Sequence, residues 1–562
     1  MRMLVGLAVA AVMMQQPAGD RPAGNTRGTR SVVMARNGAI ATSQPLATAA
    51  GLKVLQDGGN AIDAAVTAAA VLSVVEPTMN GPGGDLFAIV YSAKDHKVHG
   101  LNASGRAPAA ATLDEFKKRN LQHVPLRGEL SVSVPGVVDG WNELLTKHGT
   151  RTLAQALEPA IRYARDGYAV SEIIAGQWKE VESLLSRDAK AAAVFLPGGK
   201  APAPGDVFRN PALASSLEQI ARGGRDVFYK GAIAKAIADD MQRRNGLLTA
   251  KDLADHHADW VEPLSTTYRG YQVLELPPNT QGVTALEMLN ILEGFDLKSL
   301  GHNTAAYLHV MVEAKKIAFA DRGAWIGDPS STPPKAIERM LSKDYAAERR
   351  KEINPDKASE YKALTLTGTA APPADPEPAG RGDTIYMTAA DSQGNVISLI
   401  QSLYETFGSG IVAGDTGIVL HDRANLFSLT PGHPNQIAPG KRPFHTLVPA
   451  MVMKDGAPWL SFGVMGGDMQ AQGHAQVLAN LIDFGMNIQE AGEAPRFRHS
   501  GNGLALESAF TADARNGLTA RGHHVTGGTG AWGGFQGILI DPKTRVLMAG
   551  SDPRKDGMAA GW

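Results

Sequence analysis

The stretch that decides the fold runs from Gly382 to Ser402 and reads GDTIYMTAADSQGNVISLIQS. Two runs in it, Thr384 to Ala390 and Val396 to Ser402, are rich in apolar and β-branched residues, and Asp391 to Asn395 between them has the composition of a turn. Two such runs around a turn predict a β-hairpin. A Thr at the start of a strand is unremarkable by itself, so its meaning depends on the sequence around it.

The residues before the hairpin have a different composition. Residues 365–382 read TLTGTAAPPADPEPAGRG, with four prolines among Gly, Ala and Thr. Proline lacks a backbone N–H and cannot sit inside a helix or a central strand, so this composition predicts no packed element. We expect a flexible tail over 365–383 that separates a helix-rich front part from a strand-rich back part.

The front part shows strong helical patterning. Thr48 to Val75 is rich in Ala and Val with helical periodicity, and Gly58-Gly59-Asn60 interrupts it with a stop followed by a new start. This pattern predicts two helices packed closely on another element. We also expect helices over residues 153–164, 232–244, 285–292 and 305–320, and strands over 87–91 and 273–276.

The composition excludes several classes of function. The 562 residues carry 55 Lys and Arg against 56 Asp and Glu, so there is no basic surplus of the kind that favours nucleic-acid binding. There is no cysteine, which rules out disulfides, thiolate catalysis and iron–sulfur clusters.

The N-terminus has features of a targeting segment. Arg2 precedes an apolar run from Leu4 to Met14, which suits a secretory signal and is too short to span a membrane. We expect a signal peptide over residues 1–18, a disordered lead-in over 19–30 and a periplasmic or secreted protein, the alternative being a misassigned start. No later stretch of the sequence reaches 18 consecutive apolar residues, so we expect no membrane span after the N-terminus.

Motifs along almost the whole chain occur in the order of one enzyme family. From about Ala41 to Trp562 the chain resembles the gamma-glutamyltransferase family of N-terminal-nucleophile hydrolases. The stretches that carry the resemblance are ATSQPLATAAGLKVLQDGGNAIDAAVTAAAVLSVVEP at 41–77, Gly81-Pro82-Gly83-Gly84, Gly105-Arg106-Ala107-Pro108, Ser133-Val134-Pro135-Gly136, Asp321-Arg322, Gly327-Asp328-Pro329, Gly382-Asp383-Thr384, Thr406-Phe407-Gly408-Ser409-Gly410, Lys441-Arg442-Pro443, Gly466-Gly467 and Ala494-Pro495-Arg496-Phe497.

The resemblance implies an α+β fold, a four-layer αββα sandwich. It also implies self-cleavage between Asp383 and Thr384 into a large subunit, residues 31–383, and a small subunit, residues 384–562. Both would contribute strands and stay together as a heterodimer. Thr384 would then carry the nucleophilic hydroxyl and a free α-amine with a pKa near 8, so nucleophile and base lie on one residue. No cofactor and no metal is implied.

Further catalytic roles follow from the same resemblance. Ser402 occupies the place of a second hydroxyl residue that assists the nucleophile. Gly466 and Gly467 look like an oxyanion hole, because adjacent glycines let backbone N–H groups approach a tetrahedral intermediate closely. Without the family context, a tight turn would be the simpler interpretation of the two glycines.

The positions that grip the glutamyl group depart from the family pattern. Ser104 stands where the arginine for the α-carboxylate is expected, and Asn425-Leu426 stand where an aspartate for the α-amine is expected. The remaining pocket positions are occupied by Tyr404, His445 and Thr446. We expect Arg106, Tyr404, His445 and Thr446 to bind substrate, Arg106 by pairing with a carboxylate. His445 is equally consistent with a packed pocket wall.

The expected function is therefore hydrolysis or transfer of a γ-glutamyl group from a small glutathione-like amide. An amidase or acylase for glutaryl, cephalosporin-type or oxamic amides is the first alternative, and an inactive binding or scaffold protein is the second. Asp255, His256, His257 and Asp259 could suggest a metal site. Adjacent histidines do not share a helix face, so a solvated helix edge is the favoured interpretation.

Overall fold

The structure, a computed structural model, describes residues 29–366, 371–373, 382–501, 503–527 and 532–562. The predicted signal peptide at 1–18, nearly all of the lead-in at 19–30 and most of the tail at 365–383 lie outside these ranges. The hairpin predicted after the tail is confirmed. Strands β10 (Asp383–Asp391) and β11 (Val396–Tyr404) pair antiparallel. The Asp391 carboxylate accepts hydrogen bonds from the backbone N–H groups of Gln393 and Asn395, which closes the turn.

This hairpin forms the centre of a seven-stranded antiparallel sheet. β10 pairs on its other side with β2, and β11 pairs with β3, so strands from before the predicted cleavage point flank the hairpin from after it on both sides. The strand order is β19 (Met558–Gly561), β2 (Gly38–Thr42), β10, β11, β3 (Asp85–Ser92), β4 (Lys97–Ala103) and β7 (Asp259–Val261).

A second seven-stranded antiparallel sheet packs face to face on the first. Between the two sheets lies a core that includes Phe87, Tyr386, Ile400, Met451 and Ile538. The strand order is β1 (Val33–Ala35), β18 (Leu547–Ser551), β17 (Phe535–Ile540), β13 (Ala457–Val464), β12 (Ala450–Lys454), β9 (Tyr271–Glu275) and β8 (Leu264–Tyr268). Each sheet thus buries both faces, one against the other sheet and one against helices.

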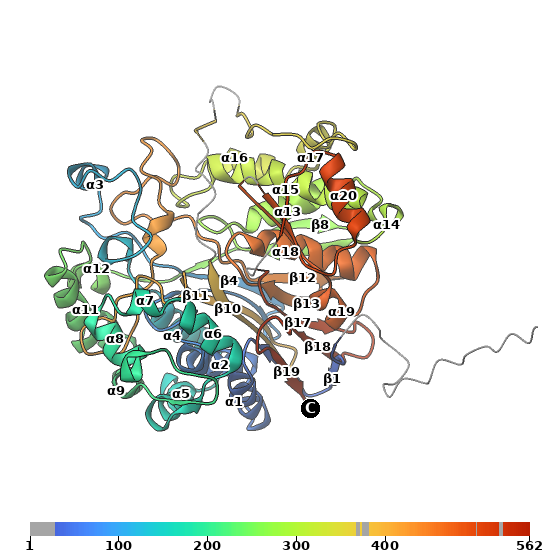
Figure 1. Cartoon of the computed structure of the whole chain (residues 1–562). Helices are drawn as coiled ribbons and strands as arrows, with labels where there is room; N and C mark the ends of the chain where they lie inside the picture. The colour runs from blue at the N-terminus through green and yellow to red at the C-terminus, as the bar shows by residue number, and fades with distance from the viewer. Residues whose placement is uncertain (1–28, 367–370, 374–381, 502, 528–531) are drawn as a thin grey trace, which may run out of the picture.

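The helices cover the outer faces and complete the four layers (Figure 1). One layer lies on the first sheet and consists of α1 (Pro45–Gln56), α2 (Ala61–Val75), α4 (Val137–His148), α5 (Leu153–Asp166) and, beyond them, α6 (Glu172–Glu180), α7 (Glu182–Leu185), α8 (Ala189–Phe195), α9 (Pro211–Gly223), α10 (Arg225–Tyr229), α11 (Ala232–Arg243) and α12 (Ala250–Ala254). The other lies on the second sheet and includes α13 (Gly282–Leu292), α15 (Ala305–Trp325), α18 (Met469–Leu478) and α19 (Ile488–Glu493).

Shorter elements complete the chain. They are α3 (Leu113–Lys118), α14 (Leu297–Leu300), α16 (Pro334–Met340), α17 (Lys343–Arg350), α20 (Ala512–Ala520), the 3-10 turns η1 (Glu129–Ser131), η2 (Pro197–Gly199) and η3 (Arg423–Leu426), the π-turn η4 (Ala479–Asp483), the pair β5 (Tyr168–Ala169) and β6 (Val207–Phe208), and the small sheet β14 (Phe497–Ser500), β15 (Gly503–Leu506) and β16 (Val525–Gly527).

The two helices predicted at 48–75 are confirmed as α1 and α2. Asn60 and Asp63 form a reciprocal capping box that starts α2 directly after the glycine break. The small residues serve close packing, since a Cβ added at Gly51 in α1 would lie 2.3 Å from Ile40 Cδ1 and 3.1 Å from the carbonyl oxygen of Ala64 in α2. All fifteen residues of α2 are buried, which explains a helix with almost no polar face.

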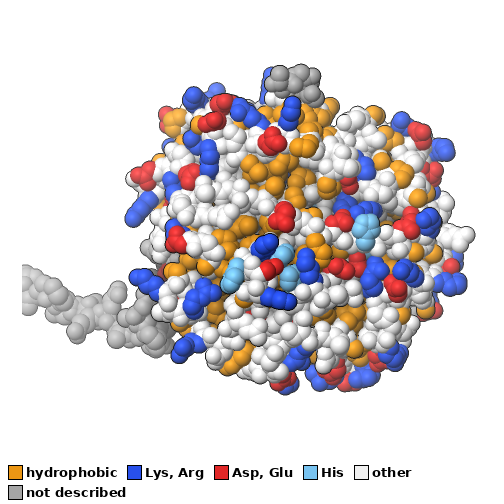
Figure 2. Space-filling model, turned by 180° about the vertical axis from the view of Figure 1, so that it is seen from behind, with side chains coloured by type: hydrophobic (Ala, Val, Ile, Leu, Met, Phe, Trp, Pro, Cys, Tyr) orange, Lys and Arg blue, Asp and Glu red, His pale blue; other side chains and the backbone are white. Residues whose placement is uncertain are grey.

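The surface agrees with the balanced charge of the sequence. On the face shown in Figure 2, basic and acidic side chains are interspersed. Within the part of the chain that the structure describes, no helix combines the length and apolar character needed to cross a membrane.

Candidate active site

Thr384 lies on the inner face of the first sheet, at the end of a strand. Its hydroxyl meets that of Ser402, which lies two residues after Ile400 of the core between the sheets, so Thr384 faces the second sheet. The pairing register of β10 and β11 shifts between Asp383 and Ile385, a bulge of the kind that redirects a side chain near an active site. The Thr384 side chain is almost fully buried.

The Thr384 hydroxyl meets the predicted assisting residue. Thr384 Oγ1 donates to Ser402 Oγ at 3.3 Å, and the same Ser402 oxygen accepts from the Tyr404 backbone N–H at 2.7 Å. The first distance is long for a pair of hydroxyls, and the second fixes the Ser402 oxygen in place. The structure thus brings the two predicted hydroxyl residues side by side.

The glycine that precedes the predicted cleavage point packs into the same place. Gly382 has φ of 54°, and its N–H donates to Glu405 Oε1 at 2.6 Å. A Cβ at this position would lie 2.7 Å from Gly467 Cα and 3.4 Å from the Tyr404 ring. The chain just before Thr384 is therefore held between the glycine pair and Tyr404.

Gly466 and Gly467 form a turn with the features of an anion site. Their φ angles are 112° and 58°, a region that favours glycine, which explains the residue type at both positions. Neither N–H donates to an acceptor in the described part of the chain. Helix α18 begins two residues later, so its positive end adds to the field at this turn. The pair is suited to stabilise an oxyanion.

A buried ion pair holds this turn from behind. Arg322 donates to Gln281 Oε1 and to Asp468 Oδ1, both at 2.7 Å, while Gln281 Nε2 donates to the carbonyl oxygen of Gly467 at 3.1 Å. The guanidinium also lies over the rings of Phe319 and Phe444. Sequence reasoning gave Gln281 and Asp468 no role; the Asp321-Arg322 motif was the available signal.

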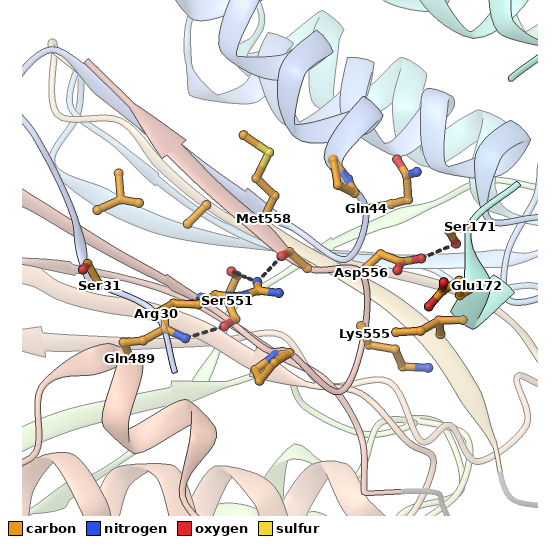
Figure 3. A pocket seen from close by; sticks show the side chains of 16 residues that line it. Arg30, Ser31, Gln44, Ser171, Glu172, Gln489, Ser551, Lys555, Asp556 and Met558 are labelled. Atoms are coloured by element: carbon orange, nitrogen blue, oxygen red, sulfur yellow. Dashed lines mark hydrogen bonds between the residues drawn. The ribbon is translucent and has the colours of Figure 1, made fainter. Parts of the chain in front are cut away.

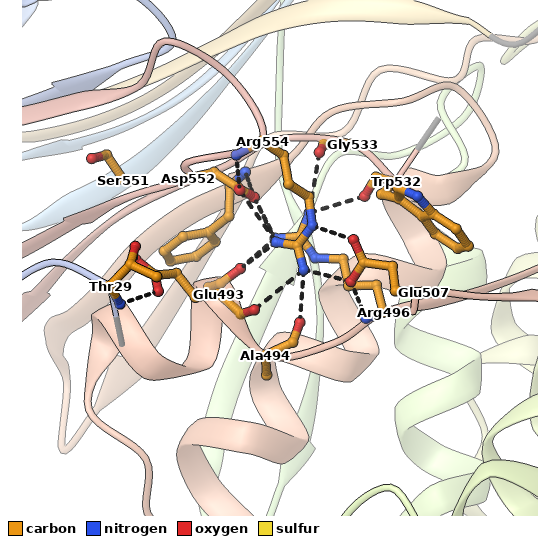
Figure 4. Close-up of polar contacts among 12 residues, drawn as sticks. Thr29, Glu493, Ala494, Arg496, Glu507, Trp532, Gly533, Ser551, Asp552 and Arg554 are labelled. Carbon is orange, nitrogen blue, oxygen red and sulfur yellow. Dashed lines mark hydrogen bonds and ion pairs between the residues drawn. The ribbon is translucent and has the colours of Figure 1, made fainter. Parts of the chain in front are cut away.

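A second buried cluster, centred on Arg496 and Asp552, lies next to the segment that packs on the turn (Figure 4). Arg496 pairs with Asp552 at 2.8 Å and donates to the carbonyl oxygens of Trp532 and Gly533. A Cβ at Gly466 would lie 3.1 Å from Gly533 Cα, so the segment held by Arg496 packs on the glycine turn. Arg496 thus holds the Trp532-Gly533 segment against the glycine turn.

Tyr404 and Thr446, two predicted substrate contacts, meet an arginine that the sequence did not single out. Arg423 is fully buried and donates to Thr446 Oγ1 at 3.1 Å, and its guanidinium carbon lies 4.5 Å from the centroid of the Tyr404 ring. Burial lowers the pKa of Arg423, and nearby Asp85 opposes that change.

His445 is a buried wall residue. Its Nε2 lies 3.1 Å from Asp85 Oδ2, its Nδ1 accepts from the Leu447 N–H at 3.3 Å, and its ring packs edge-on against Phe87. Burial, with the nearby Arg423, lowers the pKa of His445 to about 3, so the ring is neutral at ordinary pH. Of the two alternatives for this residue, the geometry favours the packed wall.

Asp85 is the anionic centre behind that wall. Besides His445, its carboxylate accepts from the Gly105 N–H at 2.8 Å and lies 3.1 Å from His421 Nδ1. Burial opposes the charged form, but His421 and His445 together hold the pKa of Asp85 well below its usual range. The side chain is thus a buried charge with its partners in place. Its only sequence signal was its position directly after the Gly83-Gly84 motif.

Arg106, predicted to bind a substrate carboxylate, is engaged elsewhere. Its guanidinium pairs with Asp259 at 2.9 Å and donates to the carbonyl oxygen of His257. Arg442 shares the same Asp259 carboxylate at 2.6 Å and also donates to Ser104 Oγ. The structure does not bring Arg106 into contact with Thr384, Tyr404 or Thr446.

Asn425 stands where the family resemblance leads one to expect an aspartate for the substrate α-amine. Asn425 Nδ2 donates to the carbonyl oxygen of Val124 at 2.7 Å, so it supports a neighbouring loop.

The expectation of a solvated helix edge at 255–259 is wrong for two of its residues. Helix α12 ends at Ala254, and His256 is buried and stacks on Tyr229. Asp259 begins β7 and pairs with Arg106 and Arg442. The chain turns inward here to reach the sheet.

A different group of potential metal ligands comes together beside α15, which contributes two of the three residues. His309, Glu313 and His523 lie close to one another in the described residues. His309 Nδ1 lies 2.8 Å from His523 Nε2, and Glu313 accepts from Lys316 and Tyr361. Because these atoms are already paired, the group is a hydrogen-bond network.

A cavity of about 680 Å³ lies away from Thr384, between the start of the described chain and the C-terminal strand (Figure 3). Its lining includes Arg30, Gln44, Ser171, Asp556 and Met558, and none of the residues around Thr384. Arg30 spans one side by donating to Ser551 Oγ and the carbonyl oxygen of Gly557.

Comparison with known proteins agrees with the sequence motifs and the fold. The family model described as Gamma-glutamyltranspeptidase matches residues 47–562. The glutathione hydrolase-like YwrD proenzyme of Bacillus subtilis (strain 168) is 40% identical over 92% of this chain and 97% of its own. The glutathione hydrolase proenzyme of Escherichia coli (strain K12) is 36% identical over 94% and 93%. A cephalosporin acylase from Bacillus halodurans has a crystal structure that matches with a TM-score of 0.88 at 42% identity, covering 98% of this chain and 99% of that one.

Proposed function

The chain belongs to the gamma-glutamyltranspeptidase family of enzymes, and from this premise we propose that Thr384 is the nucleophile of a self-processing amidase. The amidase hydrolyses or transfers the γ-glutamyl group of small glutathione-like donors. The observation that carries the proposal is the Thr384 hydroxyl, hydrogen-bonded to Ser402, where Gly382 packs on Gly467. Among the described residues, the N–H groups of Gly466 and Gly467 have no acceptor.

The first step is self-cleavage. Thr384 Oγ1 attacks the carbonyl carbon of Asp383, and the C–N bond to Thr384 breaks as its nitrogen takes up a proton. The product is an ester between Asp383 and Thr384. Water then hydrolyses this ester, which frees the α-carboxylate of Asp383 and the Thr384 hydroxyl and leaves the amine released in the shift as a new N-terminus. Gly382 and Glu405 hold the approaching chain, and the N–H groups of Gly466 and Gly467 stabilise the negative oxygen that forms.

The second step is turnover by the matured enzyme. The free α-amine of Thr384 removes the proton of its own hydroxyl, and Ser402 orients that hydroxyl. Attack on the donor amide expels an amine and leaves an acyl group on Thr384. Water or an acceptor amine then removes the acyl group and regenerates the hydroxyl. The glycine turn serves both steps.

Separation of chains on a denaturing gel, with intact mass, tests the proposal. The wild type is expected to give two chains, the smaller beginning at Thr384, and Thr384→Ala a single chain without amidase activity. Thr384→Ser should still cleave itself, because it keeps the hydroxyl.

Thr388→Ala is the matched control. Thr388 is buried on the same strand face and bonds to Ser461, so its loss perturbs β10 without touching the nucleophile. A fully active wild type with an unbroken bond between Asp383 and Thr384 would refute the assignment.

A specific observation favours a second candidate, an acylase whose acyl group lacks the α-amine. The position expected to hold that amine carries Asn425, whose side chain is turned to Val124. The cephalosporin acylase match agrees with this candidate. Comparing γ-glutamyl-p-nitroanilide with glutaryl-p-nitroanilide on matured protein separates the two candidate functions. The two substrates have the same leaving group and differ only in the α-amino group of the acyl part.

A further inference from the structure

Arg423 is a buried charged residue, and some of its N–H groups have no hydrogen-bond acceptor among the described residues. Its side chain is fully buried in η3, where an ionised group normally has its hydrogen-bonding capacity filled. Only Nη1 has a hydrogen-bond acceptor, Thr446 Oγ1. Nε and Nη2 have none among the described residues, and Nε lies 3.8 Å from Asp85 Oδ2, too far for a hydrogen bond.

A second unused donor lies beside it. The Tyr404 hydroxyl is buried without a partner in the described structure, and the Tyr404 ring lies under the Arg423 guanidinium. Two neighbouring buried side chains thus present N–H and O–H groups with no acceptor. Native proteins rarely leave such groups unpaired, so their presence together points to an acceptor that arrives from outside.

The acceptor is not supplied by the surrounding carboxylates. Asp85 is the nearest, and it is already bonded to Gly105 and His445. Asp422, the preceding residue, accepts from the Glu405 N–H, and its second oxygen lies 3.6 Å from Arg127. Arg423 is therefore balanced in charge by Asp85 but not saturated in hydrogen bonds.

The pair lies where an acyl group bound to Thr384 would extend. The Tyr404 N–H bonds to Ser402, the hydroxyl partner of Thr384. Thr446 bonds to Arg423 through its hydroxyl and to Gln281 through its carbonyl oxygen, and Gln281 also binds Gly467. Gly382 packs against the edge of the Tyr404 ring, so its departure after cleavage opens space beside both donors.

From this geometry we propose that Arg423 and the Tyr404 hydroxyl bind the free carboxylate of the acyl group and so select acyl groups that end in one. The guanidinium offers two N–H groups in the planar arrangement that a carboxylate accepts. The inference rests on Thr384 as the acylated residue. It assigns carboxylate recognition to Arg423, whereas the sequence pointed to Arg106, which Asp259 holds.

The test compares a carboxylate with its uncharged counterpart. Matured wild type is assayed with glutaryl-p-nitroanilide and with the analogue whose terminal carboxylate is a carboxamide. We expect kcat/KM to favour the acid on the order of 100-fold, because the carboxamide presents an NH2 group to the guanidinium where the carboxylate presents a second, charged acceptor oxygen. In Arg423→Gln this preference should fall to within about 3-fold, and Arg423→Lys should keep part of it, since the charge remains without the planar fork.

Two further variants make the assignment specific. Tyr404→Phe removes only the hydroxyl and should reduce the preference several-fold. Arg349→Gln is the matched control, a buried arginine on α17 that bonds to Glu352 and Lys362, and it should leave the preference unchanged. If Arg106→Gln abolishes the preference while Arg423→Gln retains it, the inference is overturned.

Calorimetric titration with glutarate separates this inference from the proposed function. Glutarate should bind matured wild type and bind Arg423→Gln at least 10-fold more weakly, whether or not either protein turns over an amide. Absence of turnover with glutarate binding intact would refute the amidase and keep the carboxylate site. Turnover with equal rates for acid and amide, or equal glutarate affinity in both proteins, would refute the carboxylate site. If Arg423→Gln fails to cleave itself, the wild-type preference and Tyr404→Phe decide the outcome in the same way.

Discussion

At the scale of single residues, the proposed site brings together backbone and side-chain groups that would each be ordinary elsewhere. Thr384 is a strand residue, Ser402 is a strand residue and Gly466 is a turn residue. The register shift in β10 and the alternation of both strands direct the two hydroxyls to the same face. The chemistry therefore depends on small geometric changes at these positions.

Ser402 provides the first prediction at this scale. Ser402→Ala should slow both self-cleavage and turnover, on the order of 100-fold, because the partner that orients the Thr384 hydroxyl is lost. Ser402→Thr restores the hydroxyl and should remain within a few-fold of wild type. The rate of two-chain formation and kcat are the measurements. Equal rates for Ser402→Ala and wild type would show that Ser402 has no part in orienting the nucleophile.

Asp422 provides a pH-dependent prediction. Burial raises the pKa of Asp422 to about 7; Arg127 opposes the change and Glu405 adds to it. An unfolded Asp has a pKa near 4, so between about pH 4 and 7 the folded state binds more protons than the unfolded state. The free energy of unfolding therefore falls as the pH rises through this window, and the loss is complete above pH 7.

Asp422→Asn removes this titration. In a Thr384→Ala background, which keeps one chain, the variant should exceed its parent in stability by about 3 to 4 kcal/mol at pH 8, the difference vanishing near pH 4. Urea unfolding at several pH values measures this, and Asp114→Asn at an exposed position of α3 serves as control. A difference that is constant with pH would contradict the assignment.

At the scale of elements, glycine has opposite effects in two helices of the same layer. Gly51 in α1 lies against Ile40 and α2, whereas Gly176 in α6 is exposed with no atom within 4 Å of an added Cβ. The first glycine permits close packing of two helices. The second contributes only backbone freedom, which is unfavourable in a helix.

These two positions form a matched pair. Gly176→Ala should stabilise the protein by about 0.5 to 1 kcal/mol through helix propensity. Gly51→Ala should destabilise it by about 1 to 3 kcal/mol, because the new methyl group overlaps Ile40 and Ala64. Thermal or urea unfolding of both variants gives the sign. A stabilising Gly51→Ala would show that α1 and α2 are packed more loosely than described.

Comparing the elements with the sequence shows which parts of the fold and of the candidate site could be predicted. The hairpin at 384–402 and the helices α1 and α2 were predictable, because turn composition and periodicity are local signals. Arg423 and Asp85 were not, because their contact depends on β3 pairing with β11 across more than three hundred residues of chain. His256 was misread for a similar reason: its polar neighbours suggest solvent, but the chain turns it against Tyr229.

At the scale of the whole molecule, the two segments joined at Thr384 are interleaved. In the first sheet β2 and β3 flank β10 and β11, and β19 pairs with the far side of β2. In the second sheet β12 from the back part pairs with β9 from the front part. Cutting one peptide bond removes none of these pairings.

We therefore expect the two chains of the cleaved protein to elute together in size-exclusion chromatography without denaturant. They should separate only when urea unfolds the sheets, because the strands share hydrogen bonds and buried apolar surface along their whole length. Unprocessed Thr384→Ala is the control for elution volume. Release of the smaller chain under native conditions would contradict the interleaved arrangement.

The interleaving has a lasting consequence for the enzyme after maturation. In the uncut precursor, β10 can pair with β2 and β11 while one chain folds. The two cleaved chains, once unfolded, would have to associate in solution before either sheet could form, because each sheet contains strands from both. The proposed two-chain protein would thus be a state reached in one direction only, its durability set by how slowly it opens and not by an equilibrium to which it can return.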